Sequence, residues 1–285
     1  MTTLVAWTGT AAARTALDWA IIREYLLDRH VILCHVAGPS DERPLSKAAL
    51  DDLAATLQQD RSGIRFTAEL LHGDPVEQLE RRGRDGSLLV VGTDTRNEHP
   101  GRFEHSLGMA LSQRGVVPVV IVPIDARHGA PGFVIGFDGS PASQAALEFA
   151  AAEADRRSES LVVARSWRLH PVEEDAADAP AGRFDEELDG RRLEAAGVIA
   201  PLRERYPGLA VTLRFAHGET VQGLLATAGG AGLLVLGTDD LSRTSAGEST
   251  DHAVVMRMHT AVAIIPAGCT VRVAAPDAVV GAIRP

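Results

Sequence analysis

The chain repeats itself. Four landmarks occur twice in the same order within its 285 residues. One matching pair could arise by chance, but four in one order indicate an internal duplication, so the chain should fold as two similar units. The landmarks are Ala-Leu-x-Trp/Phe-Ala at 16–20 and 146–150, His-Gly at 72–73 and 217–218, LLVVGT/LLVLGT at 88–93 and 233–238, and VVIVP/VAIIP at 119–123 and 262–266.

The spacing of the landmarks divides the chain into domains. The offset between the copies grows from 130 at Ala16/Ala146 to 145 at His72/His217, so the second unit contains an insertion. The acidic, Ala- and Gly-rich stretch near 171–190 is the expected place for it. We therefore expect a first domain at 1–124, a polar linker with Gly and Pro at 125–131, and a second domain at 132–285 with a tail after 267.

Each unit alternates short apolar stretches with helical patterns. The stretches at 3–8, 31–37 and 88–92 are typical of strands that are buried on both faces of a parallel sheet. Apolar residues four apart between 13 and 25 predict a helix between the first two. Because this alternation continues through both units, the sequence predicts an α/β fold with two doubly wound parallel sheets of five strands each. Ligands of such folds bind beyond the carboxyl ends of the strands.

The first strand of each unit ends in a candidate binding turn. In the second unit it runs into Asp138-Gly139-Ser140, which offers a carboxylate, a flexible turn and free N–H groups. A turn followed by a helix cap explains these residues equally well. The first unit has Gly9 and Thr10 at the matching positions and no carboxylate before them.

The fourth strands end in Gly92 and Gly237, each followed by a polar loop and a helix. A glycine at a strand end lets the backbone approach a ligand closely, and a helix N-terminus beyond it suits a phosphate. We therefore count both glycines as nucleotide-binding candidates.

These ordered features resemble the universal stress protein family, and the duplication resembles its tandem members. The resemblance covers nearly all of residues 1–267. It implies flavodoxin-like or Rossmann-like units that pair through their last strands. We therefore expect an internal pseudo-dimer in which the segments near 117–123 and 260–266 lie close together. Some family members bind ATP through a loop written Gly, two residues, Gly, nine residues, Gly, then Ser or Thr, and others lack it.

The first copy departs from that loop at two positions. Gly92 and Ser106 match, whereas Thr95 and His105 stand where the second and third glycines belong. A protonated histidine is compatible with an anion, so His105 and Ser106 remain candidate nucleotide-binding residues.

The second copy departs more severely. Gly237 and Ser249 match, but Asp240 and Glu248 would face a phosphate with like charge. At ~4 Å such a pair costs about 1 kcal/mol in water and about 4 kcal/mol at an effective dielectric constant of 20, although bound Mg²⁺ could relieve it. The unit that has Asp138 thus has the poorer loop, and neither unit has a complete nucleotide site.

Other functional classes find less support. A net charge of −10 argues against nucleic-acid binding. Enzyme motifs are missing, and Ser249 lies in a Gly-x-Ser-x pattern that lacks its last glycine, which favours a helix cap over a nucleophile. We expect no catalytic residue and no metal site, and Cys34 should be a buried core thiol of low reactivity. With no signal peptide and no membrane span, we expect a cytoplasmic protein.

The sequence therefore predicts a non-enzymatic tandem stress-response module with a binding or regulatory role and weak or lost nucleotide binding. ATP is the candidate cofactor, self-association is expected, and nucleic acid and membrane are not expected partners. One alternative is a member that binds ATP competently. Another is an enzyme or a carrier for a different small ligand in the strand-end region.

We predict that limited proteolysis of the native protein cuts first within 171–190. This stretch is strongly acidic and has Arg183 as its one basic residue, so it should be the most mobile internal segment. Mass spectrometry of the first fragments locates the cut. Initial cleavage in the 125–131 linker would contradict the prediction.

Overall fold

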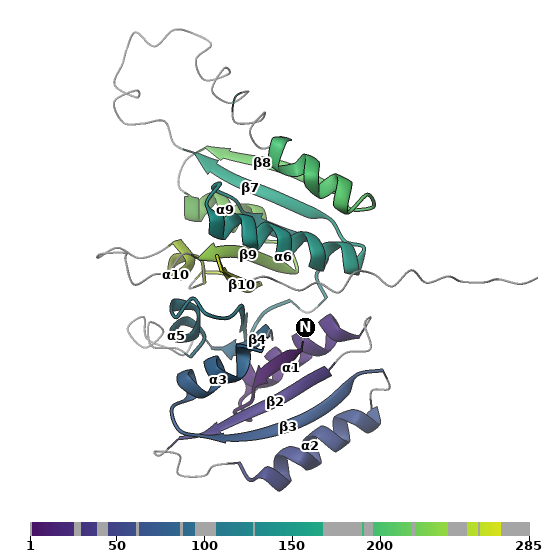
Figure 1. Cartoon of the computed structure of the whole chain (residues 1–285), viewed down its shortest axis with the longest axis vertical. Coiled ribbons are helices and arrows are strands. Elements are labelled where there is room, and N and C mark those ends of the chain that lie inside the picture. The colour runs from purple at the N-terminus through teal and green to yellow at the C-terminus, as the bar shows by residue number, and fades with distance from the viewer. Residues whose placement is uncertain are drawn as a thin grey trace, which may run out of the picture.

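A computed structural model shows the chain as two α/β halves stacked along the long axis of the molecule (Figure 1). The insertion predicted near 171–190 lies outside the described residues except for Gly190. The structure describes residues 2–25, 30–38, 45–60, 63–85, 88–94, 107–127, 129–167, 190, 196–217, 220–238, 250–255 and 257–268.

The first half follows the predicted alternation of strands and helices. Asp74 caps the third helix by accepting a hydrogen bond from the Glu77 backbone N–H at 3.0 Å, as the Asp-Pro pair predicts. Its elements are β1 (Thr3–Ala6), α1 (Ala11–Glu24), β2 (His30–Ala37), α2 (Lys47–Asp60), β3 (Arg65–His72), α3 (Pro75–Gly83), β4 (Leu88–Thr93), α5 (Leu107–Gln113) and β5 (Val119–Pro123).

The second half repeats this order, and residues 196–205 also form a helical segment. Its elements are β6 (Phe133–Gly136), α6 (Pro141–Arg157), β7 (Leu161–Trp167), β8 (Val211–His217), α9 (Thr220–Ala228), β9 (Leu233–Thr238), α10 (Thr250–Val255) and β10 (Ala261–Pro266).

All ten strands form one sheet, in the order β3-β2-β1-β4-β5-β10-β9-β6-β7-β8. Within each half the strands are parallel, and their order is that of the Rossmann fold. The halves join where β5 and β10 pair antiparallel, with Val262 opposite Ile121 and Ile264 opposite Val119. This confirms the pseudo-dimer and the predicted proximity of the two last strands. The domain limits themselves stay predictions.

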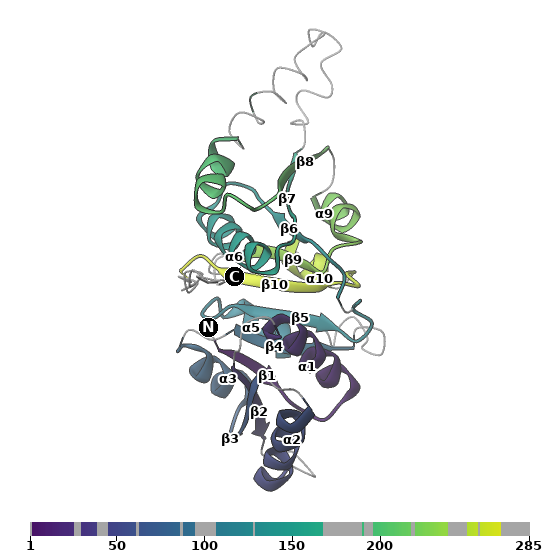
Figure 2. The ribbon, with the colours of Figure 1, turned by 90° about the vertical axis from the view of Figure 1, so that its right-hand side faces the viewer.

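Helices cover both sides of this sheet (Figure 2), because its strands are apolar on both faces. One apolar cluster joins one face of the sheet to α1, α2, α6 and the helical segment 196–205. The other cluster joins the opposite face to α3, α5, α9 and α10. Each cluster contains residues from both halves, so the core is continuous across the β5–β10 joint.

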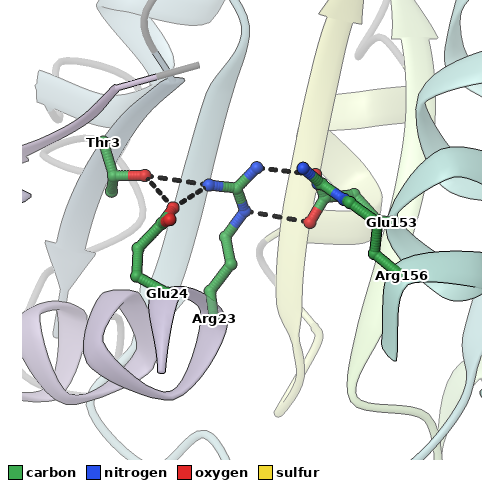
Figure 3. Close-up of polar contacts among 5 residues, drawn as sticks. All are labelled: Thr3, Arg23, Glu24, Glu153 and Arg156. Carbon is green, nitrogen blue, oxygen red and sulfur yellow. Dashed lines mark hydrogen bonds and ion pairs between the residues drawn. The ribbon is translucent and has the colours of Figure 1, made fainter. Parts of the chain in front are cut away.

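A buried polar cluster also crosses the joint (Figure 3). Arg23 at the end of α1 donates two hydrogen bonds to the Glu153 carboxylate on α6, from Nε at 2.9 Å and from Nη2 at 2.6 Å. It also contacts Glu24 and donates to Thr3 Oγ1 at 2.9 Å, and Arg156 pairs with Glu153. Burial lowers the pKa of Arg23, while neighbouring Glu24 acts in the opposite direction. Removing one partner from such a buried pair typically costs about 3–5 kcal/mol.

The Cys34 thiol is buried on β2, as the sequence predicts. Burial, with a smaller effect of Glu69, raises its pKa to about 12 from the model-compound value of 9.0. Because the thiolate is therefore favoured in the unfolded chain, the stability that this thiol contributes is lost as the pH rises from about 9 towards 12.

We predict that Cys34 resists alkylation in the native protein at pH 8 and becomes labelled only as the chain unfolds, because the thiolate is the reactive form. Peptide mass spectrometry after iodoacetamide treatment separates Cys34 from Cys269, which lies outside the described residues. Rapid labelling of Cys34 without denaturant would contradict this assignment.

Candidate functional site

The strand order reverses once in each half, between β1 and β4 and between β6 and β9. Doubly wound sheets bind ligands beyond the carboxyl ends of the strands at such points. We call residues 7–10 with 93–94 the first strand-end region, and residues 137–140 with 237–238 the second strand-end region.

Both regions begin with the same strand-to-helix turn. Gly9 and Gly139 have φ angles of +74° and +90°, which a residue with a side chain adopts only under strain. Thr10 and Ser140 then cap α1 and α6, each side chain accepting from the backbone N–H three residues on, at 3.2 and 3.1 Å. The turns therefore follow from the Gly-Thr and Gly-Ser pairs in the sequence.

Asp138 is engaged by its own turn. Its Oδ1 accepts a hydrogen bond from the Ser140 backbone N–H at 2.9 Å. Partial burial favours a higher pKa for Asp138, but hydrogen bonds from Ser140 and Ser143 outweigh it together, so its pKa lies below its usual value. Ser143 Oγ accepts from the Gly139 N–H at 3.1 Å and donates to the Ser140 carbonyl at 2.9 Å. This carboxylate thus stabilises the loop that presents it.

The first strand-end region has hydroxyl groups in place of the carboxylate. Thr8 and Thr10 share a hydrogen bond of 3.0 Å between their hydroxyls. Thr93, at the end of β4, is 5% exposed, and its hydroxyl has no hydrogen-bond partner among the described residues. The matching Thr238 is 3% exposed and has a partner. A buried hydroxyl that lacks a partner is costly unless a water or a ligand satisfies it.

The strand-end glycines serve the packing of the protein's own helices. A Cβ on Gly92 would lie 2.0 Å from the Ala12 carbonyl oxygen, and a Cβ on Gly237 would lie 2.3 Å from the carbonyl carbon of Ala142. The backbones of α1 and α6 therefore occupy the space that each glycine leaves open. The close approach expected for a ligand is made instead by α1 at Gly92 and by α6 at Gly237, the helices that follow the neighbouring strands β1 and β6.

His35 borders the first strand-end region and is 8% exposed. Its Nδ1 lies 2.9 Å from the Trp7 carbonyl oxygen, and its Nε2 accepts from the Leu45 N–H at 3.4 Å. These partners fit a neutral imidazole with the proton on Nδ1. His35 thus ties the end of β2 to the end of β1.

The comparisons with known proteins agree with this arrangement. The family model described as "Universal stress protein family" matches residues 133–266. A universal stress protein of Mycobacterium tuberculosis is 29% identical over 252 residues, which cover 80% of this chain and 82% of that protein. The second half of the chain thus matches the universal stress protein family, and most of the chain is similar to one of its members.

Solved universal stress proteins share the fold of the whole chain. One from Archaeoglobus fulgidus has a TM-score of 0.67 at 16% identity and covers 94% of this chain and 98% of its own. A putative universal stress protein from Pseudomonas aeruginosa has a TM-score of 0.59 at 14% identity, covering 93% and 92%. Both cover more than nine-tenths of this chain, as a two-unit protein would.

The structure brings the candidates of each half together. Gly9, Thr10 and Gly92 meet at the N-terminus of α1, and Asp138, Gly139, Ser140 and Gly237 meet at that of α6. The remaining candidates and the departures from the ATP loop lie outside the described residues: His105, Ser106, Ser249, Thr95, Asp240 and Glu248.

Two further features are not found in the described part of the chain. There, no three His, Cys, Asp or Glu side chains gather closely enough to hold a metal ion. No helix in that part is long and apolar enough to span a bilayer.

Sequence reasoning missed Thr93 and His35 as parts of the first strand-end region. Thr93 is the last residue of the LLVVGT landmark, in which the glycine before it was the expected binding residue. His35 is a lone histidine in an apolar strand. The signal for Thr93 is its position at the end of β4, which borders the reversal of the sheet order, whereas His35 lies near the end of β2, the strand beside β1.

We predict that Gly237→Ala destabilises the protein by about 1–3 kcal/mol, because the added methyl group must displace the α6 backbone. Gly208→Ala is the matched control, since a Cβ there meets nothing within 4 Å. It should stay within about 0.5 kcal/mol of the wild type. Urea denaturation measures both, and unchanged stability of Gly237→Ala would show that the glycine is not needed for helix packing.

Proposed function

We propose that this universal stress protein is a non-enzymatic binding or regulatory module of the stress response in which nucleotide binding is weak or lost. We also infer that it acts in the cytoplasm as a self-contained pseudo-dimer. The observation that carries the proposal is the second strand-end region, whose carboxylate and hydroxyl groups already bond within their own turn.

A ligand at the second strand-end region would have to replace these internal bonds. Asp138 accepts from its own turn, Ser140 caps α6, and Ser143 bonds to the backbone of both Gly139 and Ser140. A group with satisfied hydrogen bonds gains little by exchanging them for bonds to a ligand. The preformed turn therefore favours a structural role for these residues.

The loop sequence adds an electrostatic cost in the same half. Asp240 and Glu248 stand in the sequence where the ATP loop has its second and third glycines, and a loop of the family's form would bring their negative charge to the place of a phosphate. Each carboxylate within ~4 Å of a phosphate opposes binding by about 1–4 kcal/mol, depending on the local dielectric constant. This cost supports lost binding in the second half.

The first half supports a second candidate function, which is weak nucleotide binding. Thr93 presents a buried hydroxyl that the described residues leave without a partner, beside the turn that leads into the N-terminus of α1. Such a hydroxyl can bond to a ligand at no cost to an existing contact. The first loop also carries His105 and Ser106, which tolerate an anion better than two carboxylates do.

Titration calorimetry with ATP and Mg²⁺ tests both candidates. We expect weak or undetectable binding by the wild type, and stronger binding by Glu248→Gly because repulsion is relieved and backbone N–H groups can close on a phosphate. The gain should be about 1–4 kcal/mol at most and smaller at high salt. Adding Asp240→Gly should increase it again.

Two valine variants locate any residual binding. Thr93→Val removes the unpartnered hydroxyl from the first half and should abolish weak wild-type binding, whereas the matched Thr238→Val in the second half should leave it unchanged. Tight ATP binding by the wild type that Glu248→Gly weakens would refute the proposal and make Glu248 a functional ligand.

A further inference from the structure

The β5–β10 joint has the symmetry of a dimer made of two copies. The landmarks VVIVP and VAIIP make residues 119–123 equivalent to 262–266. In the sheet, Val120 lies opposite Ala263, so one pair of equivalent positions faces itself. The flanking pairs Val119–Ile264 and Ile121–Val262 are exchanged by the same operation. A pseudo-twofold axis therefore passes between Val120 and Ala263.

The buried ion pair lies on the same axis. The landmark offset of 130 makes Arg23 equivalent to Glu153. The same offset relates the first residues of the two helices, Ala11 of α1 and Pro141 of α6. Arg23 Nε and Nη2 bond directly to the two carboxylate oxygens of Glu153 (Figure 3). Both side chains are no more than 4% exposed.

Two pairs of equivalent positions meet on the axis, 23 with 153 and 120 with 263, and we call these the self-facing positions. Each pair holds different residues in the two halves. One pairs a cation with an anion, and the other pairs a larger with a smaller apolar residue, Val120 with Ala263. Two first halves paired in the same way would bury Arg23 against Arg23 and Val120 against Val120. Two second halves would bury Glu153 against Glu153 and leave space between two alanines.

Like-with-like pairing would fail mainly because of charge. Arg23 keeps Glu24 and Glu153 keeps Arg156 in either pairing, but two like charges in buried contact at the axis repel each other, and each loses its two-bond partner across the joint. A twofold interface places equivalent residues against each other, so one copy of either half cannot avoid the clash. The unlike half places an oppositely charged side chain against Arg23 or Glu153 at the axis.

We propose that the Arg23–Glu153 pair selects the partner of each half, so that the joining face accepts only the unlike half. The partner that the face of the first half fits is a universal-stress-type unit with an axial carboxylate. The face of the second half fits a unit with an axial guanidinium. Neither face accepts its own copy from a second chain.

The neighbouring charges make each half neutral at the joint. Glu24 contacts Arg23 within the first half and Arg156 contacts Glu153 within the second half, so the four charges sum to zero and partner selection rests on the direct contact between positions 23 and 153. Arg23→Glu would leave the four with a net charge of −2, and Glu153→Arg would give +2. Joining the first half of one variant to the second half of the other restores zero in both new joints.

Co-expression of the full-length Arg23→Glu and Glu153→Arg chains with different tags tests partner selection. We expect each variant alone to be destabilised or insoluble. Together they should yield a soluble one-to-one complex of two 30.2-kDa chains, in which the halves are exchanged. Tandem affinity purification followed by native mass spectrometry detects it. Differently tagged wild-type chains set the background for self-association through other faces, which the axial variants should exceed.

The control is an ion pair away from the joint. Arg205 donates to Glu148 at 2.7 Å within the second half, and both side chains are about half exposed. Co-expressed Glu148→Arg and Arg205→Glu chains should remain monomers. A second measurement places Arg23→Glu and Glu153→Arg in one chain, which should recover a soluble monomer with at least tenfold coupling in the unfolding equilibrium constant.

The outcomes are decisive for the proposal. An exchanged complex from the axial pair alone, together with recovery in one chain, supports partner selection. Absence of the complex overturns it even when stability is recovered, because the pair then acts on stability only. The same complex from the control pair would also overturn it, since exchange would then be independent of the axis.

Discussion

The pairing of β5 with β10 is the contact on which the rest of this structure depends. A five-stranded parallel sheet ends in two edges with unpaired N–H and C=O groups, and such edges attract other chains. Here the inner edge of each half is satisfied by the other half. Helices from both halves then pack into clusters that are continuous across the joint, so the halves share one core on each face of the sheet.

That contact also explains why the molecule tolerates a buried ion pair at its centre. Arg23 reaches across the joint because α1 and α6 flank the axis on the same face of the sheet, where their residues belong to one cluster. Its guanidinium fits the carboxylate of Glu153 in a two-bond arrangement that holds a charge in the interior. The polar contact therefore fixes the position of helices whose apolar contacts are less directional.

Much of the fold could be predicted because the sequence carries its evidence locally. Landmark repeats, apolar strand patterns and the Asp74-Pro75 cap each depend on neighbouring residues, and they gave the element order, whereas the pairing of the last strands was implied by the resemblance to the universal stress protein family. The ion pair could not be predicted in this way, since Arg23 and Glu153 are 130 positions apart and look like ordinary surface charges of two helices. Aligning the two copies and comparing charges at equivalent positions would have revealed it.

The candidate site was predicted less completely for a similar reason. The sequence identifies Asp138 as a carboxylate at a strand end, but only the structure shows that one of its oxygens already accepts a hydrogen bond from the Ser140 N–H. Likewise, sequence marks Gly92 and Gly237 as positions that need space, without saying that a helix backbone fills it. In both cases the residue type constrains the geometry, whereas the partner is decided by the tertiary fold.

The self-facing positions of the joint have a consequence for how such a chain evolves. In a dimer of identical units, a substitution on the twofold axis changes both sides at once, so a single charge there always meets itself. Fusion of two copies removes that restriction, because positions 23 and 153 then mutate separately. Once opposite charges have become fixed, deleting either half leaves a remainder that no longer suits its own copy. The duplication is then irreversible by simple loss, and natural selection maintains both halves even where only one retains a ligand.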